Sequence, residues 1–152
     1  MDPAAPLEVH VSHHFEASPE RVYDAWLLPQ EMQRWMFGTH IHDVKVLRME
    51  VDPQVGGRFS LQVRRSGQFI EHTGHYLELE RPRRLAMTWS VKGAPDDAFS
   101  RVQVDMAPSG SGCVLILTHR MDAKWGSHAQ LVRNGWSAML DALALSLAVS
   151  LD

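Results

Sequence analysis

Four ionisable side chains could do chemistry, because strand alternation places each of them on the apolar side of its strand. They are His13, Glu71, His75 and His119. Each lies two residues from an apolar position of the same predicted strand, and side chains two residues apart share one face of a sheet. Imidazole and carboxylate groups inside an apolar pocket could orient a ligand's hydroxyl or carboxylate, or act as acid and base. His75, His119 and Glu71 are therefore candidate catalytic residues; the alternative is that each reaches solvent or forms one internal hydrogen bond.

A metal centre built from the histidines is not expected. Imidazole and carboxylate groups bind zinc, but no two histidines stand four residues apart on a predicted helix beside a glutamate. His13 faces the opposite side of its strand from His10 and His14. Cys113 has no basic residues near it in the sequence, so we expect a small core or edge residue rather than a nucleophile. The chain also lacks the phosphate-loop and dinucleotide motifs, and no cofactor is predicted.

Aromatic side chains indicate a second kind of site. Six of them lie on elements that we expect to converge: Trp26, Trp35, Phe37, Phe59, Trp89 and Trp136. Such rings either pack the core or border a cavity, and an aromatic wall would favour flat or amphipathic ligands. The predicted ligand pocket is lined by Trp35, Phe37, Phe59, His75, Trp89, His119, Trp136, Leu140 and Leu143.

The elements that must position these side chains follow from local patterns. Residues 8–16 alternate as a strand, and Ser18-Pro19 begins a helix to about residue 28, since serine caps helices and proline suits their first position. Pro29 ends that helix and opens a second one that reaches Met36. A period of two then predicts strands near 43–51, 57–65, 68–80, 84–91, 100–107 and 112–120. Short turns between these strands predict an antiparallel meander.

The last predicted element is a helix that begins at a capping box, Ser127 with Gln130, and ends near residue 149. One apolar stripe holds Val132, Trp136, Met139, Leu140, Leu143 and Leu147. A second, weaker stripe holds Leu131, Ala138, Ala142, Leu145 and Val149. Two stripes predict a deeply embedded helix or a homodimer contact. The fold class is α+β: a curved antiparallel β-sheet wraps around the long C-terminal helix, and two short helices after the first strand close one end.

Composition limits the class of protein. The 152 residues carry a formal net charge of −3, and 45% of them are hydrophobic. We predict one domain over residues 8–150 after a tail at 1–7, and the charge argues against binding to nucleic acid. A single cysteine excludes an internal disulfide. No stretch is apolar enough to span a membrane and no secretory signal is evident, so we expect a cytoplasmic protein.

Short motifs recur along the chain in the order found in one family. They are residues 17–26 (ASPERVYDAW), Arg34-Trp35, residues 52–59 (DPQVGGRF), Gly74, Arg81-Pro82, Thr88-Trp89, residues 117–119 and Gly135-Trp136. Together they resemble the START/Bet v 1-like (SRPBCC) superfamily, and within it proteins similar to the C-terminal domain of the activator of the heat-shock-protein-90 ATPase. The resemblance covers nearly the whole chain and implies the helix-grip fold. Two positions depart from the family: Met36 replaces a second aromatic residue and Val55 replaces a proline.

The resemblance implies three functions. The first is a binding protein that holds a hydrophobic or amphipathic small molecule in a cavity between the sheet and the C-terminal helix. The second is a co-chaperone-like protein-interaction module that acts on a chaperone ATPase. The third is a cyclase or hydrolase-type enzyme that uses the inward histidines and Glu71. The expected partners are accordingly a hydrophobic ligand, a second copy of the chain or a chaperone, without nucleic acid.

Overall fold

The computed structural model describes residues 7–36, 44–93 and 100–149, except for the side chains of 123–125 and 149. Its elements in chain order are β1 (Leu7–Phe15), α1 (Pro19–Ala25), α2 (Pro29–Trp35), β2 (Val44–Val51), β3 (Arg58–Arg65), β4 (Gln68–Glu80), β5 (Arg84–Val91), β6 (Ser100–Ser109), β7 (Gly112–Met121), η2 (Ala123–His128) and α3 (Ala129–Val149). The predicted order of one strand, two short helices, six strands and a long helix is confirmed.

Local signals account for both short helices. The Ser18 hydroxyl accepts a hydrogen bond from the Arg21 N–H at 3.1 Å, and Pro19 occupies the first turn of α1, where its missing N–H costs nothing. Pro29 starts α2 in the same way. Arg81, in the turn after β4, donates two hydrogen bonds of 2.9 and 3.0 Å to the Asp24 carboxylate. This bidentate interaction joins α1 to one end of the sheet.

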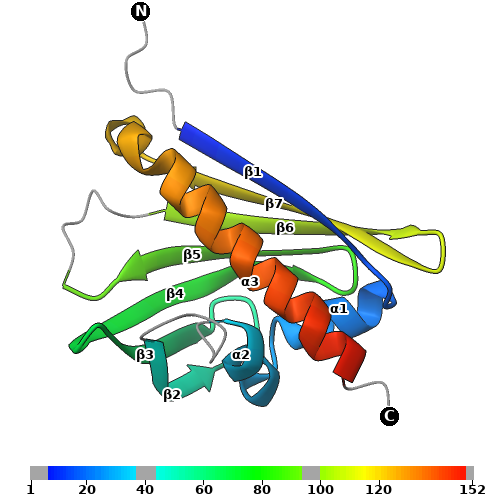
Figure 1. Ribbon diagram of the computed structural model, residues 1–152, viewed down its shortest axis with the longest axis horizontal. Coiled ribbons are helices and arrows are strands. Elements are labelled where there is room, and N and C mark those ends of the chain that lie inside the picture. Colours follow the sequence, from blue (N-terminus) through cyan, green and yellow to red (C-terminus); the bar gives the residue numbers. More distant parts are fainter. Residues whose placement is uncertain (1–6, 37–43, 94–99, 150–152) are drawn as a thin grey trace, which may run out of the picture.

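The seven strands form one antiparallel sheet in the order β1-β7-β6-β5-β4-β3-β2. The first strand pairs with the last one along its whole length, from Leu7 opposite Met121 to Phe15 opposite Cys113. Figure 1 shows the sheet curving behind α3, with α1 and α2 near one end. α3 packs against β1 and α2. The predicted helix-grip architecture is confirmed.

The inner face of the sheet and one stripe of α3 supply the core. The buried residues of that stripe are Trp136, Met139, Leu140, Leu143 and Leu147. Full burial stabilises each leucine by about 1.5–3 kcal/mol relative to an exposed one. The second stripe is divided, because Ala142 is buried whereas Leu131 and Leu145 are 70% and 69% exposed. Among the described residues, no helix is long and apolar enough to cross a membrane.

β4 contains a bulge that reverses part of the predicted pattern. Its register against β5 shifts at Leu77, which is exposed. One extra residue in a strand inverts the alternation, so the side chains before the bulge point to the opposite face from the one that the alternation after the bulge predicts. His72 and Tyr76 are therefore buried on the inner face. The prediction that Glu71 and His75 point inward is wrong, because alternation counted back from the end of β4 crosses this bulge.

The start of α3 also differs from the prediction. The turn η2 precedes the helix, and the Ser127 hydroxyl lies 3.3 Å from His128 Nδ1. The Gln130 side chain donates to Asn134 Oδ1 at 2.8 Å instead of reaching back toward Ser127. The predicted capping box therefore does not form, because both of its side chains have other partners.

Candidate functional site

An aromatic cluster occupies the space between the inner face of the sheet and α3. Trp89 of β5 is its centre: its ring lies 5.3 Å from the rings of Trp136 and His72, and 5.7 Å from Phe59. Trp26, at the end of α1, stacks on Trp136 at 6.0 Å. Four of these five rings are buried, but Trp89 is partly exposed although it points inward. Trp89 is therefore the ring of this cluster that solvent reaches most.

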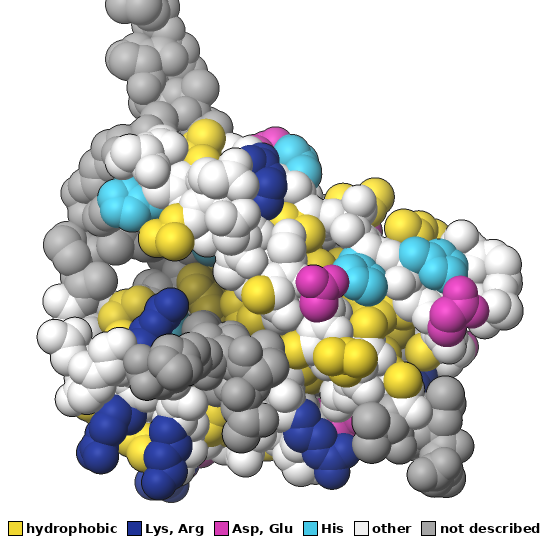
Figure 2. Space-filling view, in the orientation of Figure 1, with side chains coloured by type: hydrophobic (Ala, Val, Ile, Leu, Met, Phe, Trp, Pro, Cys, Tyr) yellow, Lys and Arg dark blue, Asp and Glu magenta, His cyan; other side chains and the backbone are white. Residues whose placement is uncertain are grey.

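The molecular surface is hollowed on this side of the molecule. Figure 2 shows a recess beside α3 in which hydrophobic side chains gather. Two buried polar atoms near the cluster, Trp26 Nε1 and the Tyr76 hydroxyl, have no hydrogen-bond partner among the described residues. The Tyr76 ring lies 5.7 Å from Phe59. An unpaired buried polar atom costs about 1–3 kcal/mol, so both groups lower the stability of the folded protein.

His119 connects α3 to the sheet through a directed chain of hydrogen bonds. A carbonyl oxygen only accepts, so the Ser100 hydroxyl donates to the Trp89 carbonyl at 2.6 Å. Ser100 Oγ then accepts from His119 Nε2–H at 2.8 Å. His119 Nδ1 accepts from Trp136 Nε1–H at 3.0 Å. Both ring nitrogens of His119 are used, which leaves neither of them for acid–base work on a substrate.

The two inner histidines are neutral near pH 7. Burial lowers the pKa of His119 from 6.5 to about 4, and a proton on Nδ1 would face the Trp136 N–H directly. Burial, together with the positive charge of Arg65, also lowers the pKa of His72 to about 4. Both imidazole rings in and beside the aromatic cluster are therefore uncharged near pH 7.

The three candidate catalytic residues are not brought together. His75 is exposed on the outer face of the sheet, next to Thr88, whose hydroxyl accepts its backbone N–H at 2.8 Å. Glu71 also points outward and accepts a hydrogen bond from the Ser60 hydroxyl at 2.7 Å. The sheet separates both residues from His119. The acid–base arrangement that the third predicted function required is therefore not formed.

The predicted pocket residues fall into three groups. Four of them meet in the cluster: Phe59, Trp89, His119 and Trp136. Three are fully buried in the core: Trp35, Leu140 and Leu143. Of the other two, His75 lies on the outer face and Phe37 lies outside the described residues. Alternation and helical spacing thus found the inner face wherever the strand was regular.

His13 and Cys113 have structural surroundings. His13 shares the inner side of β1 but lies at its edge, where Nε2 is 3.1 Å from Asp141 Oδ1 of α3 and the ring stacks on Phe15. Cys113 is buried, and burial raises the pKa of its thiol. Within the described ranges, no three His, Cys, Asp or Glu side chains are grouped so as to hold a metal ion.

Two residues of the site were missed by the sequence analysis. His72 was hidden by the bulge in β4, for which the sequence offers no clear signal. Ser100 begins β6, and its spacing from Val102 and Val104 places it on the same buried face. That spacing was a usable signal, since a polar residue at an inward strand position requires an internal partner.

The fold and its inner cluster define a helix-grip domain. The chain belongs to the family described as activator of Hsp90 ATPase homolog 1-like protein, whose model matches residues 16–148. A solved protein of Chromobacterium violaceum is 26% identical, with a TM-score of 0.78 over 91% of this chain and 94% of that one. An AHSA1-like protein of Aeromonas hydrophila is 25% identical, with a TM-score of 0.77 over 95% and 94%. A Rhodobacter sphaeroides protein shares the fold at 19% identity, with a TM-score of 0.82 over 98% and 99%. No curated protein matches the sequence.

Proposed function

We propose that this protein binds a hydrophobic or amphipathic small molecule between the inner face of its sheet and α3. The observation that supports the proposal best is the partial exposure of Trp89 at the centre of an otherwise buried aromatic cluster. A large aromatic ring left partly exposed inside a domain is available for stacking and apolar contact.

The chemistry of the recess favours an uncharged aromatic or alicyclic ligand with hydrogen-bond acceptors. His72 and His119 are neutral near pH 7, so they offer no charge to a carboxylate or an amine. Trp26 Nε1 and the Tyr76 hydroxyl are buried without a partner among the described residues, so a ligand that reached them would find two hydrogen-bond donors. The chain of hydrogen bonds through His119 holds the Trp136 ring in place, which gives His119 a positioning role.

Native mass spectrometry of freshly purified protein, followed by identification of any released molecule, is the first test. The ligand found, or the best hit of a thermal-shift screen of hydrophobic compounds, is then titrated into Trp89→Ala and His75→Ala proteins. We expect Trp89→Ala to weaken binding at least ten-fold. His75→Ala is the matched control on the outer face and should bind as the parent does. Equal binding by all three proteins would contradict the proposal.

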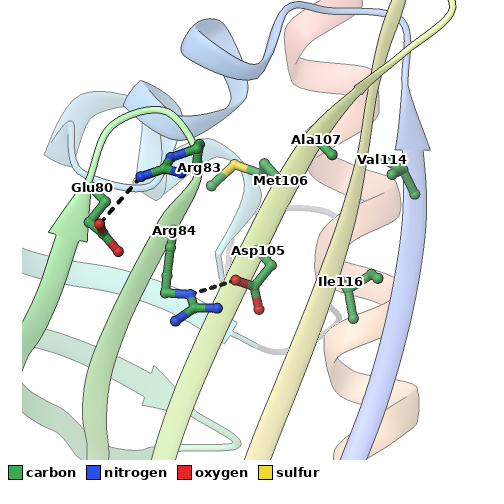
Figure 3. Close-up of a pocket in the computed structure, with 8 residues that line it drawn as sticks. All are labelled: Glu80, Arg83, Arg84, Asp105, Met106, Ala107, Val114 and Ile116. Atoms are coloured by element: carbon green, nitrogen blue, oxygen red, sulfur yellow. Dashed lines mark hydrogen bonds and ion pairs between the residues drawn. The ribbon is translucent and has the colours of Figure 1, made fainter.

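A second candidate function is a protein-interaction module that acts on a chaperone ATPase. The family description supports it, and so does an open pocket of about 400 Å³ on the outer face of β5–β7. Figure 3 shows Val114 and Ile116 on one side of this pocket and the ion-paired Arg84 and Asp105 on the other, where Arg84 Nε lies 2.7 Å from Asp105 Oδ1. The ATPase rate of the chaperone with and without this protein tests it, and an unchanged rate rejects it.

Self-association is a separate proposal about partners. Leu131 and Leu145 lie two heptads apart on α3, with the exposed Ala138 midway between them. Residues spaced by seven share one side of a helix, so they form a narrow apolar stripe that a second copy could cover. Light scattering at high concentration should show a dimer that Leu131→Ser weakens, and a monomer mass throughout would reject the dimer.

A further inference from the structure

The hairpin of β3 and β4 carries a row of exposed residues that combines two positive charges with an aromatic ring. Lys45 of β2 is directly opposite Arg64 of β3, and Arg64 is directly opposite Phe69 of β4. Residues that are directly opposite in neighbouring strands point to the same face. All three are exposed, Phe69 at 57%. We call these three residues the hairpin row.

The charges of the hairpin row have no acidic partner among the residues that the structure describes. Within the described part of the chain, neither Lys45, Arg64 nor the adjacent Arg65 forms an ion pair. By contrast, three other arginines of the outer face are ion-paired: Arg84 with Asp105, Arg101 with Glu78 and Arg120 with Glu8. Like charges placed directly opposite in a sheet are destabilising. The repulsion between the two positive charges of the hairpin row therefore lowers the stability of the fold. A negatively charged partner would relieve this repulsion.

Exposed apolar side chains accompany these charges. Phe69 ends the hairpin row, and Leu47, 40% exposed, lies in the irregular part of β2 between Lys45 and Arg48. Long basic side chains beside an exposed aromatic ring suit the boundary between lipid headgroups and acyl chains, where the charges stay at the headgroups and the ring enters the apolar layer. A soluble polyanion would use the charges but not the ring.

We propose that the hairpin row docks this protein on an anionic lipid surface. The row is too small for a stable protein interface, which needs about 20–30 residues on each side. The turn between β3 and β4 lies at the end of the molecule where the surface is hollowed (Figures 1 and 2). Membrane binding itself does not depend on whether the recess holds a ligand.

Vesicle flotation of the full chain tests the proposal, with phosphatidylcholine alone and with added phosphatidylglycerol. We expect binding to the anionic vesicles only, and its loss at about 1 M salt, where the Debye length is about 3 Å. Arg64→Gln and Lys45→Gln should each lower partitioning roughly five-fold, the usual effect of one basic residue near an anionic surface. Phe69→Ser should lower it as well. Removal of one like charge should leave the melting temperature equal or higher, which shows that these variants fold.

Two matched controls separate the hairpin row from general charge and hydrophobicity. Arg58→Gln alters an exposed arginine on the same strand, six residues and about 20 Å from Arg64. Val55→Ser alters an apolar residue that is 64% exposed in the turn between β2 and β3. Both should partition as the parent does. Binding equal on neutral and anionic vesicles, or an Arg58→Gln effect as large as that of Arg64→Gln, would overturn the proposal. Tight binding to polyglutamate or DNA that is equally strong in the parent and in Phe69→Ser would also overturn the proposal, because it would identify an acidic macromolecule as the partner.

Discussion

Ser100 is the residue on which the hydrogen-bond chain of the site depends. In Ser100→Ala, the His119 Nε2–H loses its acceptor and the Trp89 carbonyl loses its donor. A buried polar group without a partner costs about 1–3 kcal/mol, so we expect the free energy of unfolding in urea to fall by that amount. Ser90→Ala is the matched control: Ser90 is partly exposed and has only a 3.5 Å contact with Thr73. Its effect should stay within about 0.5 kcal/mol, and equal losses in the two variants would contradict the role of the chain.

Gly74 is required because the ring of Phe59 lies against it. A Cβ at this position would come within 2.5 Å of Phe59 Cε1 and would overlap the Thr88 carbonyl oxygen. Overpacking of this kind costs about 1–3 kcal/mol, so we expect Gly74→Ala to be destabilised by that amount in urea unfolding. Because Phe59 borders the aromatic cluster, the near-ultraviolet circular dichroism should change too. A Gly74→Ala protein with parental stability and spectrum would show that the backbone moves freely here.

At the scale of elements, α3 carries a glycine where its structure does not need one. Gly135 is exposed in the helix, and a Cβ there would meet no atom within 4 Å. Alanine is favoured over glycine inside a helix by about 0.5–1 kcal/mol. Gly135→Ala should therefore raise the free energy of unfolding by about that amount. A destabilised variant would mean that this side of α3 has a neighbour, such as a second copy of the chain.

The same comparison of elements explains what could be predicted from the sequence. Helix starts depend on neighbouring residues, so Ser18, Pro19 and Pro29 were sufficient to place the starts of α1 and α2. The end of α1 was predicted too late, because the helix stops at Ala25 and not near residue 28. The buried face of a strand cannot be predicted in the same way where its pairing with a neighbour is irregular. In β4, the apolar Phe69 and Leu77 both lie on the exposed side, and only the register against β5 reveals the bulge. The register depends on how two strands pair, so the residue pattern of one strand alone cannot predict it.

At the scale of the whole molecule, the candidate site brings side chains from distant parts of the chain to one place. Trp26 follows α1, Trp89 belongs to β5 and Trp136 belongs to α3. The resemblance of the motifs to a helix-grip family was enough to expect that these rings converge. The hydrogen bonds through His119 were not predictable, because each depends on the side-chain orientation that packing of α3 on the sheet imposes.

The two buried histidines also connect the stability of the whole molecule to pH. In the folded protein, His72 and His119 each have a pKa of about 4, against an ordinary value of 6.5. The unfolded chain thus takes up these protons at a higher pH than the folded chain does. The stabilisation is complete above about pH 6.5 and is lost progressively as the pH falls to about 4. The shift corresponds to about 3 kcal/mol for each ring.

Urea unfolding at several pH values between 6.5 and 4 measures this dependence. Near the middle of this range, at about pH 5, each histidine should contribute a slope of up to about 1.4 kcal/mol per pH unit. His119→Gln removes one of the two titrating rings, while its amide can still accept from Trp136 and donate to Ser100. Its slope should therefore be about half that of the parent. If His119→Gln kept the full slope, the acid sensitivity would have to come from groups other than the ring that joins α3 to the sheet.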